Sequence, residues 1–209
     1  MKQDYVENRQ SPRLNMAAIL KSSDANGPGT RDVFWFQGCS FRCQGCQNPE
    51  LWAFQRKRIM SVDSLVAGLR ERISRIDGIT VSGGEPFEQP IGLAALLEGA
   101  LALGLSTVVY TGFTFEDLMR CKNGGVARAL KATDLLIDGP YISRNRITSK
   151  PWIGSSNKRL LCLTSRFSKK DLYAAQMPIE ELFVYVDAEG MTFFHTGIKQ
   201  VDVQMIGPS

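Results

Sequence analysis

The sequence predicts an α/β fold built around a parallel sheet. Short β-branched and aromatic runs alternate with helical patterns through the middle of the chain, as βα units do. With 209 residues the chain is shorter than the roughly 250 typical of a closed eight-stranded barrel, so a partial barrel or an open sheet fits better. Because no repeat, low-complexity segment or linker divides it, we expect one domain over residues 1–209 with a core of about 14–187.

The predicted strands are short apolar runs bounded by turn residues. The run 33–37, "VFWFQ", is β-branched and aromatic, and the turn sequence Asn-Gly-Pro-Gly precedes it at 26–29. Residues 181–197 predict a terminal β-hairpin that turns at 188–190. The other predicted strands cover residues 14–20, 79–82, 106–112, 134–138 and 159–163.

The predicted helices are bounded by residues that start or stop helices. Ser61 is a suitable N-cap for an amphipathic helix over 62–76. Pro90 opens a helix that Gly104 ends, and Thr114 caps the next one. These two helices cover residues 91–103 and 115–121, and further helices are predicted over 126–132 and 168–176.

Three segments that follow predicted strands carry chemical groups. They are the cysteine loop after Gln37, the turn at 83–85 and the turn at 111–112. In folds with parallel strands, chemistry gathers where the strands end. A long polar connection over 139–158 has a length that is often functional.

Composition and charge exclude several classes of protein. The apolar share is 44%, and 25 basic against 21 acidic residues leave a net charge of +4. We therefore expect an ordinary core and no nucleic-acid partner. No run of eighteen apolar residues predicts a membrane span, and the polar segment 1–13 lacks a secretory apolar region. These features favour a cytoplasmic location, where thiols stay reduced.

Three of the five cysteines form the most informative motif. Cys39, Cys43 and Cys46 have the spacing C-x3-C-x2-C, which in a reducing compartment indicates metal or cofactor ligation. A cubane iron–sulfur cluster usually takes four thiolates, so three would leave one iron with an open position. Gly38 and Gly45 allow the backbone to bend around a bulky ligand.

A structural zinc site is the alternative for these cysteines, and it needs a fourth ligand. The single histidine, His195, lies about 150 residues downstream, and Cys121 and Cys162 are also distant in sequence. Three unrelated free thiols in one loop are less favoured still, because exposed thiols of low pKa oxidise readily. We expect packing roles for Cys121 and Cys162 and a structural role for His195.

The cysteine motif resembles the cluster motif of the radical S-adenosylmethionine enzymes. This resemblance implies a [4Fe-4S] cluster on Cys39, Cys43 and Cys46, with the amino and carboxylate groups of S-adenosyl-L-methionine chelating the fourth iron. It implies that an electron from the reduced cluster breaks the S–C5′ bond and yields a 5′-deoxyadenosyl radical. The implied fold is the short form of the family's partial (β/α) barrel, with the β-hairpin at its C-terminal end.

The segment "SGGEP" resembles the family's motif for the cosubstrate's amino group. Glycines expose backbone groups, and Glu85 can accept from an ammonium at short range. We therefore expect Gly83, Gly84 and Glu85 to bind the cosubstrate. Thr111 and Asp138, each at a strand end, are further candidates for this role, with a turn-forming function as the alternative for both.

Other segments are similar to the glycyl-radical-enzyme activating group of this family. The run "GPGTRDVFWFQGCSFRCQGCQNPELW" matches the group's opening pattern, and "YTGFTFEDL" and "WIGSSN" resemble activating enzymes of anaerobic ribonucleotide reductase. The resemblance implies an oxidoreductase that takes hydrogen from a glycine of a large partner protein. It also makes Ser155, Ser156 and Asn157 a partner or substrate loop. Gly45 and Asn26 depart from the pattern, which has an aromatic and an acidic residue there in many members.

Two functional alternatives remain open at the level of sequence. The same scaffold suits a radical enzyme that acts on a small molecule or peptide. A non-enzymatic iron–sulfur sensor or electron carrier is a different class, and it usually completes its cluster with a fourth protein ligand. A flavodoxin- or ferredoxin-type reductant is expected for the enzyme, and the basic run 56–58 suits its acidic surface, although such a run is more often plain solvated surface. No membrane partner is expected.

Overall fold

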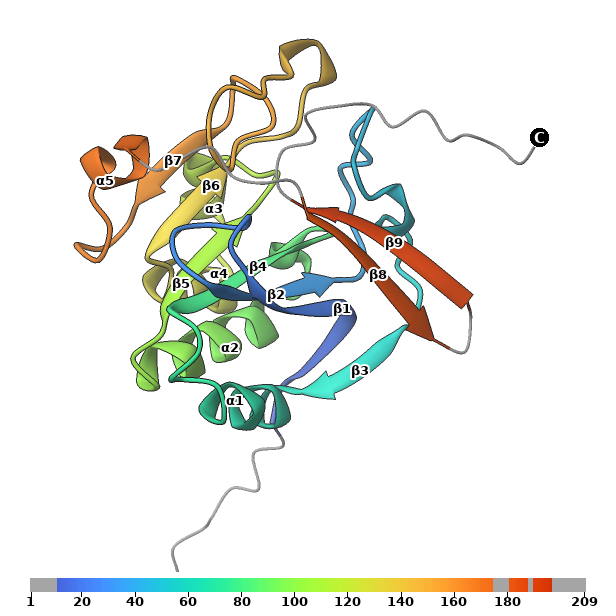
Figure 1. Cartoon of the computed structure of the whole chain (residues 1–209), viewed down its shortest axis with the longest axis vertical. Helices are drawn as coiled ribbons and strands as arrows, with labels where there is room; N and C mark the ends of the chain where they lie inside the picture. Colours follow the sequence, from blue (N-terminus) through green and yellow to red (C-terminus); the bar gives the residue numbers. More distant parts are fainter. Residues whose placement is uncertain (1–10, 175–180, 188–189, 197–209) are drawn as a thin grey trace, which may run out of the picture.

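A seven-stranded mixed sheet forms the centre of the protein (Figure 1). The computed structural model describes residues 11–174, 181–187 and 190–196. The strand order is β3-β1-β2-β4-β5-β6-β7, and helices accompany the sheet, so the expected α/β class is confirmed. The strands are β1 Arg13–Ser23, β2 Arg31–Phe36, β3 Arg58–Ser61, β4 Gly78–Gly83, β5 Ser106–Tyr110, β6 Leu135–Asp138 and β7 Arg159–Cys162.

The four middle strands run parallel, whereas the outer strands do not. Strands β2, β4, β5 and β6 are parallel neighbours, as the alternation of strands and helices predicts. Strands β1, β3 and β7 pair antiparallel with their neighbours, so the sheet is less uniform than expected. The turn segment 24–30 between β1 and β2 is too short for the crossover that a parallel pair needs. Strand β3 was not predicted, and it forms by pairing with β1.

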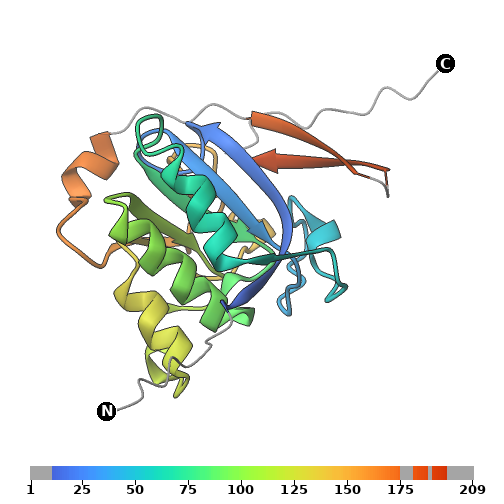
Figure 2. The same cartoon turned by 90° about the horizontal axis from the view of Figure 1, so that it is seen from below.

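Helices α1, α2 and α4 lie side by side along one face of the sheet (Figure 2). The expected caps form, since the hydroxyl oxygens of Ser61 and Thr114 accept hydrogen bonds from the first turns of α1 and α3. The helices are α1 Val62–Arg70, α2 Pro90–Ala102, α3 Phe115–Arg120, α4 Gly124–Lys131 and α5 Lys169–Ala174, and short 3-10 turns cover Pro49–Leu51, Pro86–Glu88 and Ser143–Asn145.

Helix α1 is shorter than the predicted helix over 62–76. Beyond Arg70 the chain continues in turns, in which Arg72 and Arg75 each donate to the carbonyl three residues earlier. The Arg72 guanidinium reaches the buried Asp32, with Nε 2.6 Å from Oδ2. Ile73, which a continuous helix over 62–76 would place on the apolar face four residues after Leu69, is 50% exposed.

The main core fills the space between the sheet and these helices. Side chains of β4 and β5 pack against α2, which is apolar around most of its circumference and is therefore buried. This burial stabilises the fold by roughly 25 cal/mol for each Å² of apolar surface removed from water. The largest fully buried apolar side chains are Trp35, Phe36, Leu14, Met16, Leu51, Leu69, Ile79, Leu93, Leu96, Leu97 and Leu135.

A buried arginine ties the amino ends of the parallel strands together. Arg31, at the start of β2, is fully buried and donates to Thr80 Oγ1, to the carbonyls of Ile79 and Ser106, and to that of Pro28. Burial lowers the pKa of its guanidinium to about 10. The loops 37–57 and 139–158 lie at the opposite, carboxyl ends of these strands.

The chain beyond β7 contributes a separate two-stranded sheet. Strands β8 Glu181–Asp187 and β9 Gly190–Thr196 pair antiparallel, with His195 opposite Leu182. The first two residues of the turn expected at 188–190 lie outside the described residues. Cys121 is exposed after α3, and Cys162 is partly buried in β7. Within the ranges that the structure describes, no helix is long and apolar enough to cross a membrane.

Candidate active site

The cysteine loop between β2 and β3 folds back on itself. The backbone N–H of Gly38 donates to the Leu51 carbonyl at 2.9 Å, and that of Cys39 donates to the Trp52 carbonyl at 3.1 Å. The Gln37 amide closes the loop further by donating to the Ala53 carbonyl at 2.7 Å. These contacts hold both ends of the loop, so the three cysteines lie on one closed segment.

The three thiols line a single pocket of about 740 Å³ at the carboxyl ends of the strands. Cys39 is buried, whereas Cys43 and Cys46 are partly exposed. Burial raises the pKa of the Cys39 thiol, and the backbone N–H groups of Phe41 and Arg42 oppose this rise by favouring the thiolate. Burial likewise raises the pKa of the Cys46 thiol. The pocket therefore offers sulfur ligands together with N–H donors directed at sulfur.

The backbone of the loop turns where the sequence predicts. Gly38 and Gly45 have φ values of +101° and +74°, in the left-handed region that favours glycine. Arg42 also has a positive φ, of +47°, which is uncommon for a residue with a side chain. A side chain at position 45 would meet Ser143 and Tyr141, because these residues lie against the loop from the connection after β6.

The turn at 83–85 packs directly against the cysteine loop. A Cβ on Gly83 would fall on the backbone of Phe36, and a Cβ on Gly84 would fall on the carbonyl oxygen of Gly38. The Glu85 N–H donates to that same Gly38 carbonyl at 2.8 Å. Glycine is required here because two backbones come into contact. All three residues of the turn line the pocket, as do the three cysteines.

The Glu85 carboxylate is buried and holds two loops together. Its Oε1 accepts from the Phe87 N–H and the Thr111 hydroxyl, each at 2.9 Å, and its Oε2 accepts from the Gly112 N–H at 2.8 Å. Burial raises its pKa to about 7, and the three donors oppose that rise. A carboxylate has about four acceptor positions, so one position on Oε2 remains open.

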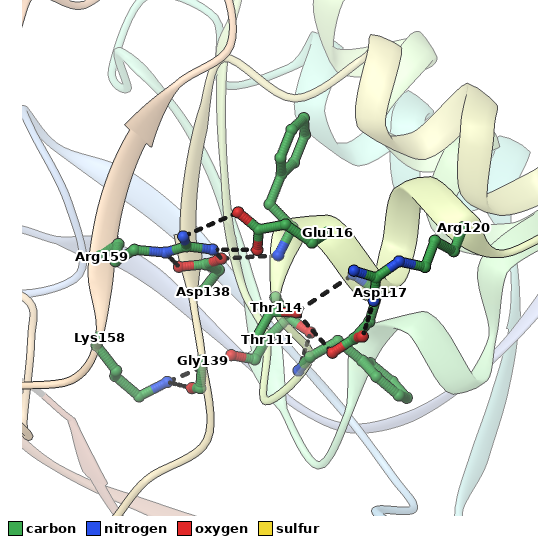
Figure 3. A network of polar contacts seen from close by, with 11 residues as sticks. Thr111, Thr114, Glu116, Asp117, Arg120, Asp138, Gly139, Lys158 and Arg159 are labelled. Atoms are coloured by element: carbon green, nitrogen blue, oxygen red, sulfur yellow. Dashed lines mark hydrogen bonds and ion pairs between the residues drawn. The ribbon is translucent and has the colours of Figure 1, made fainter.

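Thr111 and Asp138 occupy different places relative to the pocket. Thr111 is buried, lines the pocket and donates its hydroxyl to Glu85. Asp138 is also buried, but its carboxylate accepts from the Phe115 N–H at 2.7 Å and is paired with the Arg159 guanidinium (Figure 3). Asp138 does not line the pocket, so its contacts are those of a residue that positions the surrounding loops.

The serine and asparagine stretch at 155–157 lies outside the pocket lining. Ser155 is fully buried and Ser156 is exposed. Asn157 donates its amide to the Pro140 carbonyl at 2.7 Å and so ties the two ends of the 139–158 connection together. In the part of the chain that the structure describes, Ser155 Oγ and Asn157 Oδ1 have no hydrogen-bond partner.

Several pocket residues were not predicted from the sequence. Lys158, Tyr141, Trp152 and Arg146 all come from the connection between β6 and β7. For Lys158, the sequence offered one indication of a place in the pocket, namely a charged residue next to the end of a predicted strand. The sequence offered no such indication for the aromatic residues, because the path of the loop in space decides where its side chains point.

The residues present fit an iron–sulfur cluster with a bound cosubstrate. Three thiols with N–H donors, glycine turns and a large pocket are appropriate for a bulky inorganic ligand and a nucleoside-sized molecule. Over the ranges 11–174, 181–187 and 190–196, no three His, Cys, Asp or Glu side chains form a site for a single metal ion. Thiolates that each bind a different iron of a cluster need not converge on one point.

Comparison with known proteins agrees with this site. Residues 25–161 match the family model of the 4Fe-4S single cluster domain. The anaerobic ribonucleoside-triphosphate reductase-activating protein of Enterobacteria phage T4 is 30% identical over 165 residues, which cover 76% of this chain and all of that protein. Its namesake in Escherichia coli K12 is 28% identical over 64% of this chain and 88% of its own length. The pyruvate formate-lyase-activating enzyme of Clostridium pasteurianum is 32% identical over 54% of this chain and 46% of its own.

The match to the family model shows that the chain is an iron–sulfur protein with a single cluster. The chain belongs to the radical S-adenosylmethionine family of glycyl-radical-enzyme activating proteins. It is therefore an enzyme that uses a [4Fe-4S] cluster and S-adenosyl-L-methionine, as the sequence resemblance implied. A non-enzymatic sensor or carrier and a structural zinc protein do not agree with this membership.

Proposed function

We propose that this protein generates a glycyl radical on an anaerobic ribonucleoside-triphosphate reductase. The relatives that match along most of their own length carry that activity in their names. The proposal rests above all on one observation, the pocket that brings the three cysteines together with the turn at 83–85. We further propose a single domain on a partial (β/α) barrel, which the four parallel strands with intervening helices support.

In this proposal Cys39, Cys43 and Cys46 hold the cluster through their thiolates. When bound and reduced, the cluster would supply the one electron needed for reductive cleavage of S-adenosyl-L-methionine to methionine and a 5′-deoxyadenosyl radical, which would take a hydrogen atom from a glycine of the partner. The N–H groups beside Cys39 stabilise its thiolate form, which metal ligation requires.

The turn at 83–85 seats the amino-acid end of the cosubstrate. Gly83 and Gly84 expose backbone groups to the pocket, and the open position on Glu85 Oε2 accepts from the ammonium. Thr111 holds the Glu85 carboxylate in place through its hydroxyl. In this proposal Asp138 does not contact the cosubstrate. It positions the start of α3 by accepting a hydrogen bond from the Phe115 N–H.

The connection 139–158 is proposed as the surface that meets the partner. It covers one side of the pocket and carries the exposed Ser156 beside buried residues. A flavodoxin- or ferredoxin-type protein is proposed as the source of the electron. The exposed Phe54 and Arg56, on the loop that carries the cysteines, are suited to contact an acidic protein of that kind.

The test is anaerobic reconstitution followed by two measurements. Wild-type protein with dithionite and S-adenosyl-L-methionine is expected to give 5′-deoxyadenosine and methionine by mass spectrometry. With an anaerobic ribonucleotide reductase present, a glycyl radical is expected by electron paramagnetic resonance, and replacing the partner's target glycine by alanine should remove it. Cleavage without any radical on the reductase, but with hydrogen transfer from a small molecule or peptide, would refute the proposed partner.

A further inference from the structure

The Phe41 side chain, between the first two cysteines of the motif, attaches the cysteine loop to the turn after β5. Its ring packs edge-on against the Phe113 ring, with 4.8 Å between the ring centroids and 72° between the ring planes. Phe113 packs against the main core, its N–H donates to the Thr111 hydroxyl, and its carbonyl accepts from the Gly139 N–H. The loop is therefore attached to the packed part of the fold between its two ends as well as at them.

Gly112 provides the space for the Phe41 ring. A Cβ at position 112 would lie 2.7 to 3.0 Å from three atoms of that ring, so the ring would have to shift. The φ of Gly112 lies outside the left-handed region, so the backbone conformation does not require glycine there. The contact with Phe41 is what requires it, and the same glycine donates its N–H to Glu85 at 2.8 Å.

The backbone of Phe41 lies against the sulfur of Cys39. The N–H groups of Phe41 and Arg42 both favour the thiolate form of this buried cysteine. The ring and the N–H of Phe41 belong to one residue, so packing of the ring restricts where the N–H points. Phe41, Gly112 and Cys39 also line the same pocket. Hydrogen bonds to the ligand sulfurs are one of the factors that set the reduction potential of an iron–sulfur cluster.

We propose that Phe41, packed on Gly112 and Phe113, is a positioning residue that holds the N–H donors at Cys39 and thereby raises the reduction potential of the cluster. This inference rests on the proposed function, in which Cys39 is a ligand of the cluster. The electron that enters on reduction adds negative charge to the cluster and its thiolates. N–H groups directed at sulfur stabilise that charge, so a displaced donor makes the reduction less favourable.

The experiment measures the midpoint potential of the reconstituted cluster by anaerobic redox titration with electron paramagnetic resonance, without cosubstrate or partner. Phe41→Ala removes the ring, and Gly112→Ala displaces it by adding one methyl group. The variant with both substitutions tests whether they act through one contact, because the three atoms nearest to the added Cβ all belong to Phe41. Met119→Ala is the control, since this apolar side chain is 63% exposed on α3. Iron content and circular dichroism establish that each variant is loaded and folded.

Each single substitution is expected to shift the midpoint potential to a more negative value. Loss of one hydrogen bond lowers the equilibrium constant for reduction about tenfold, which corresponds to about 59 mV for one electron. Gly112→Ala should add nothing in the Phe41→Ala background. Phe41→Leu, which retains an apolar contact with Phe113, should recover most of the shift, and Met119→Ala should leave the potential unchanged.

Two results would overturn the inference and leave the proposed function standing. One is an unchanged potential in both single variants, and the other is a pair of shifts that add in the double variant, as two independent disturbances of the pocket would. A wild-type protein that holds no [4Fe-4S] cluster after reconstitution would overturn the proposed function and the inference with it.

Discussion

Glu85 shows how one side chain sets the geometry of the pocket. Its carboxylate joins the turn after β4 to the turn after β5 through Phe87, Thr111 and Gly112. Each donor favours the charged form of the acid, but nearly complete removal from water opposes that form and raises the pKa to about 7. Because the net change is a rise, burial outweighs the three hydrogen bonds together.

The raised pKa of Glu85 gives the stability of the protein a defined pH dependence. The Glu85 carboxyl group keeps its proton up to about pH 7 in the folded protein, but loses it near pH 4.5 in the unfolded chain. Its contribution to the free energy of unfolding is therefore fully present below pH 4.5 and is lost as the pH rises through 7. The free energy of unfolding of wild type minus that of Glu85→Gln should fall by about 2 to 3 kcal/mol between pH 5 and 8. Urea unfolding of the reduced protein without its cluster measures it. A difference that is flat or rises with pH would show a carboxylate that is ionised throughout.

At the level of elements, the joint between β6, β7 and α3 is held by charge. The Arg159 guanidinium, on β7, pairs both with Asp138 at the end of β6 and with Glu116 in α3 (Figure 3). Asp138 is fully buried, whereas Arg159 is 43% exposed. Water therefore partly screens the charge of Arg159, but the buried Asp138 carboxylate depends on Arg159 as its counter-ion. This joint sets the position of the 139–158 connection, whose two ends it holds.

Arg159→Met should destabilise the protein by about 2 kcal/mol, because it leaves a buried carboxylate with the Phe115 N–H alone. Arg120→Met is the matched control, since Arg120 pairs with an exposed Asp117 on the same helix and should change stability by no more than about 0.5 kcal/mol. Urea unfolding at pH 7 measures both. Equal effects of the two substitutions would contradict the role given to Asp138.

In the molecule as a whole, the parts that stabilise the fold are different from the parts that form the candidate active site. The apolar core lies between the sheet and the helices, and Arg31 holds the amino ends of the strands. The cysteine loop lies beyond the carboxyl ends, where it is held by backbone hydrogen bonds and by contact with the turn at 83–85. We therefore expect the fold to form without the cluster, in contrast to small proteins that a metal holds together.

Cys43→Ala is expected to keep the fold and lose the cluster. The free energy of unfolding of the protein without iron should change by less than about 1 kcal/mol, because Cys43 is partly exposed and outside the core. Iron analysis and the visible spectrum after reconstitution should show no stable cubane cluster. Cys121→Ala, which removes an exposed thiol after α3, should retain it. An intact cubane cluster with full cosubstrate cleavage in Cys43→Ala would refute the assignment of the ligands.

Much of the fold was predictable because its causes are local. The runs 33–37 and 79–82 form strands by their own composition, and Ser61 and Thr114 cap helices through hydrogen bonds within four residues. The spacing of the cysteines in one short loop likewise predicted a shared site. The antiparallel edges and β3 were not predictable in this way, because pairing depends on which strands meet in space.

By itself, therefore, the sequence determined the parallel core, the cysteine loop, the glycine turn beside it and the family to which the chain belongs. Only the tertiary structure decided which charged groups are engaged and which face the pocket. It paired Asp138 with Arg159 from the next strand, placed three donors around Glu85, and brought Lys158 to the pocket wall. The physical reason is that charges interact across the distances that folding creates, and residues far apart in sequence supply the partners.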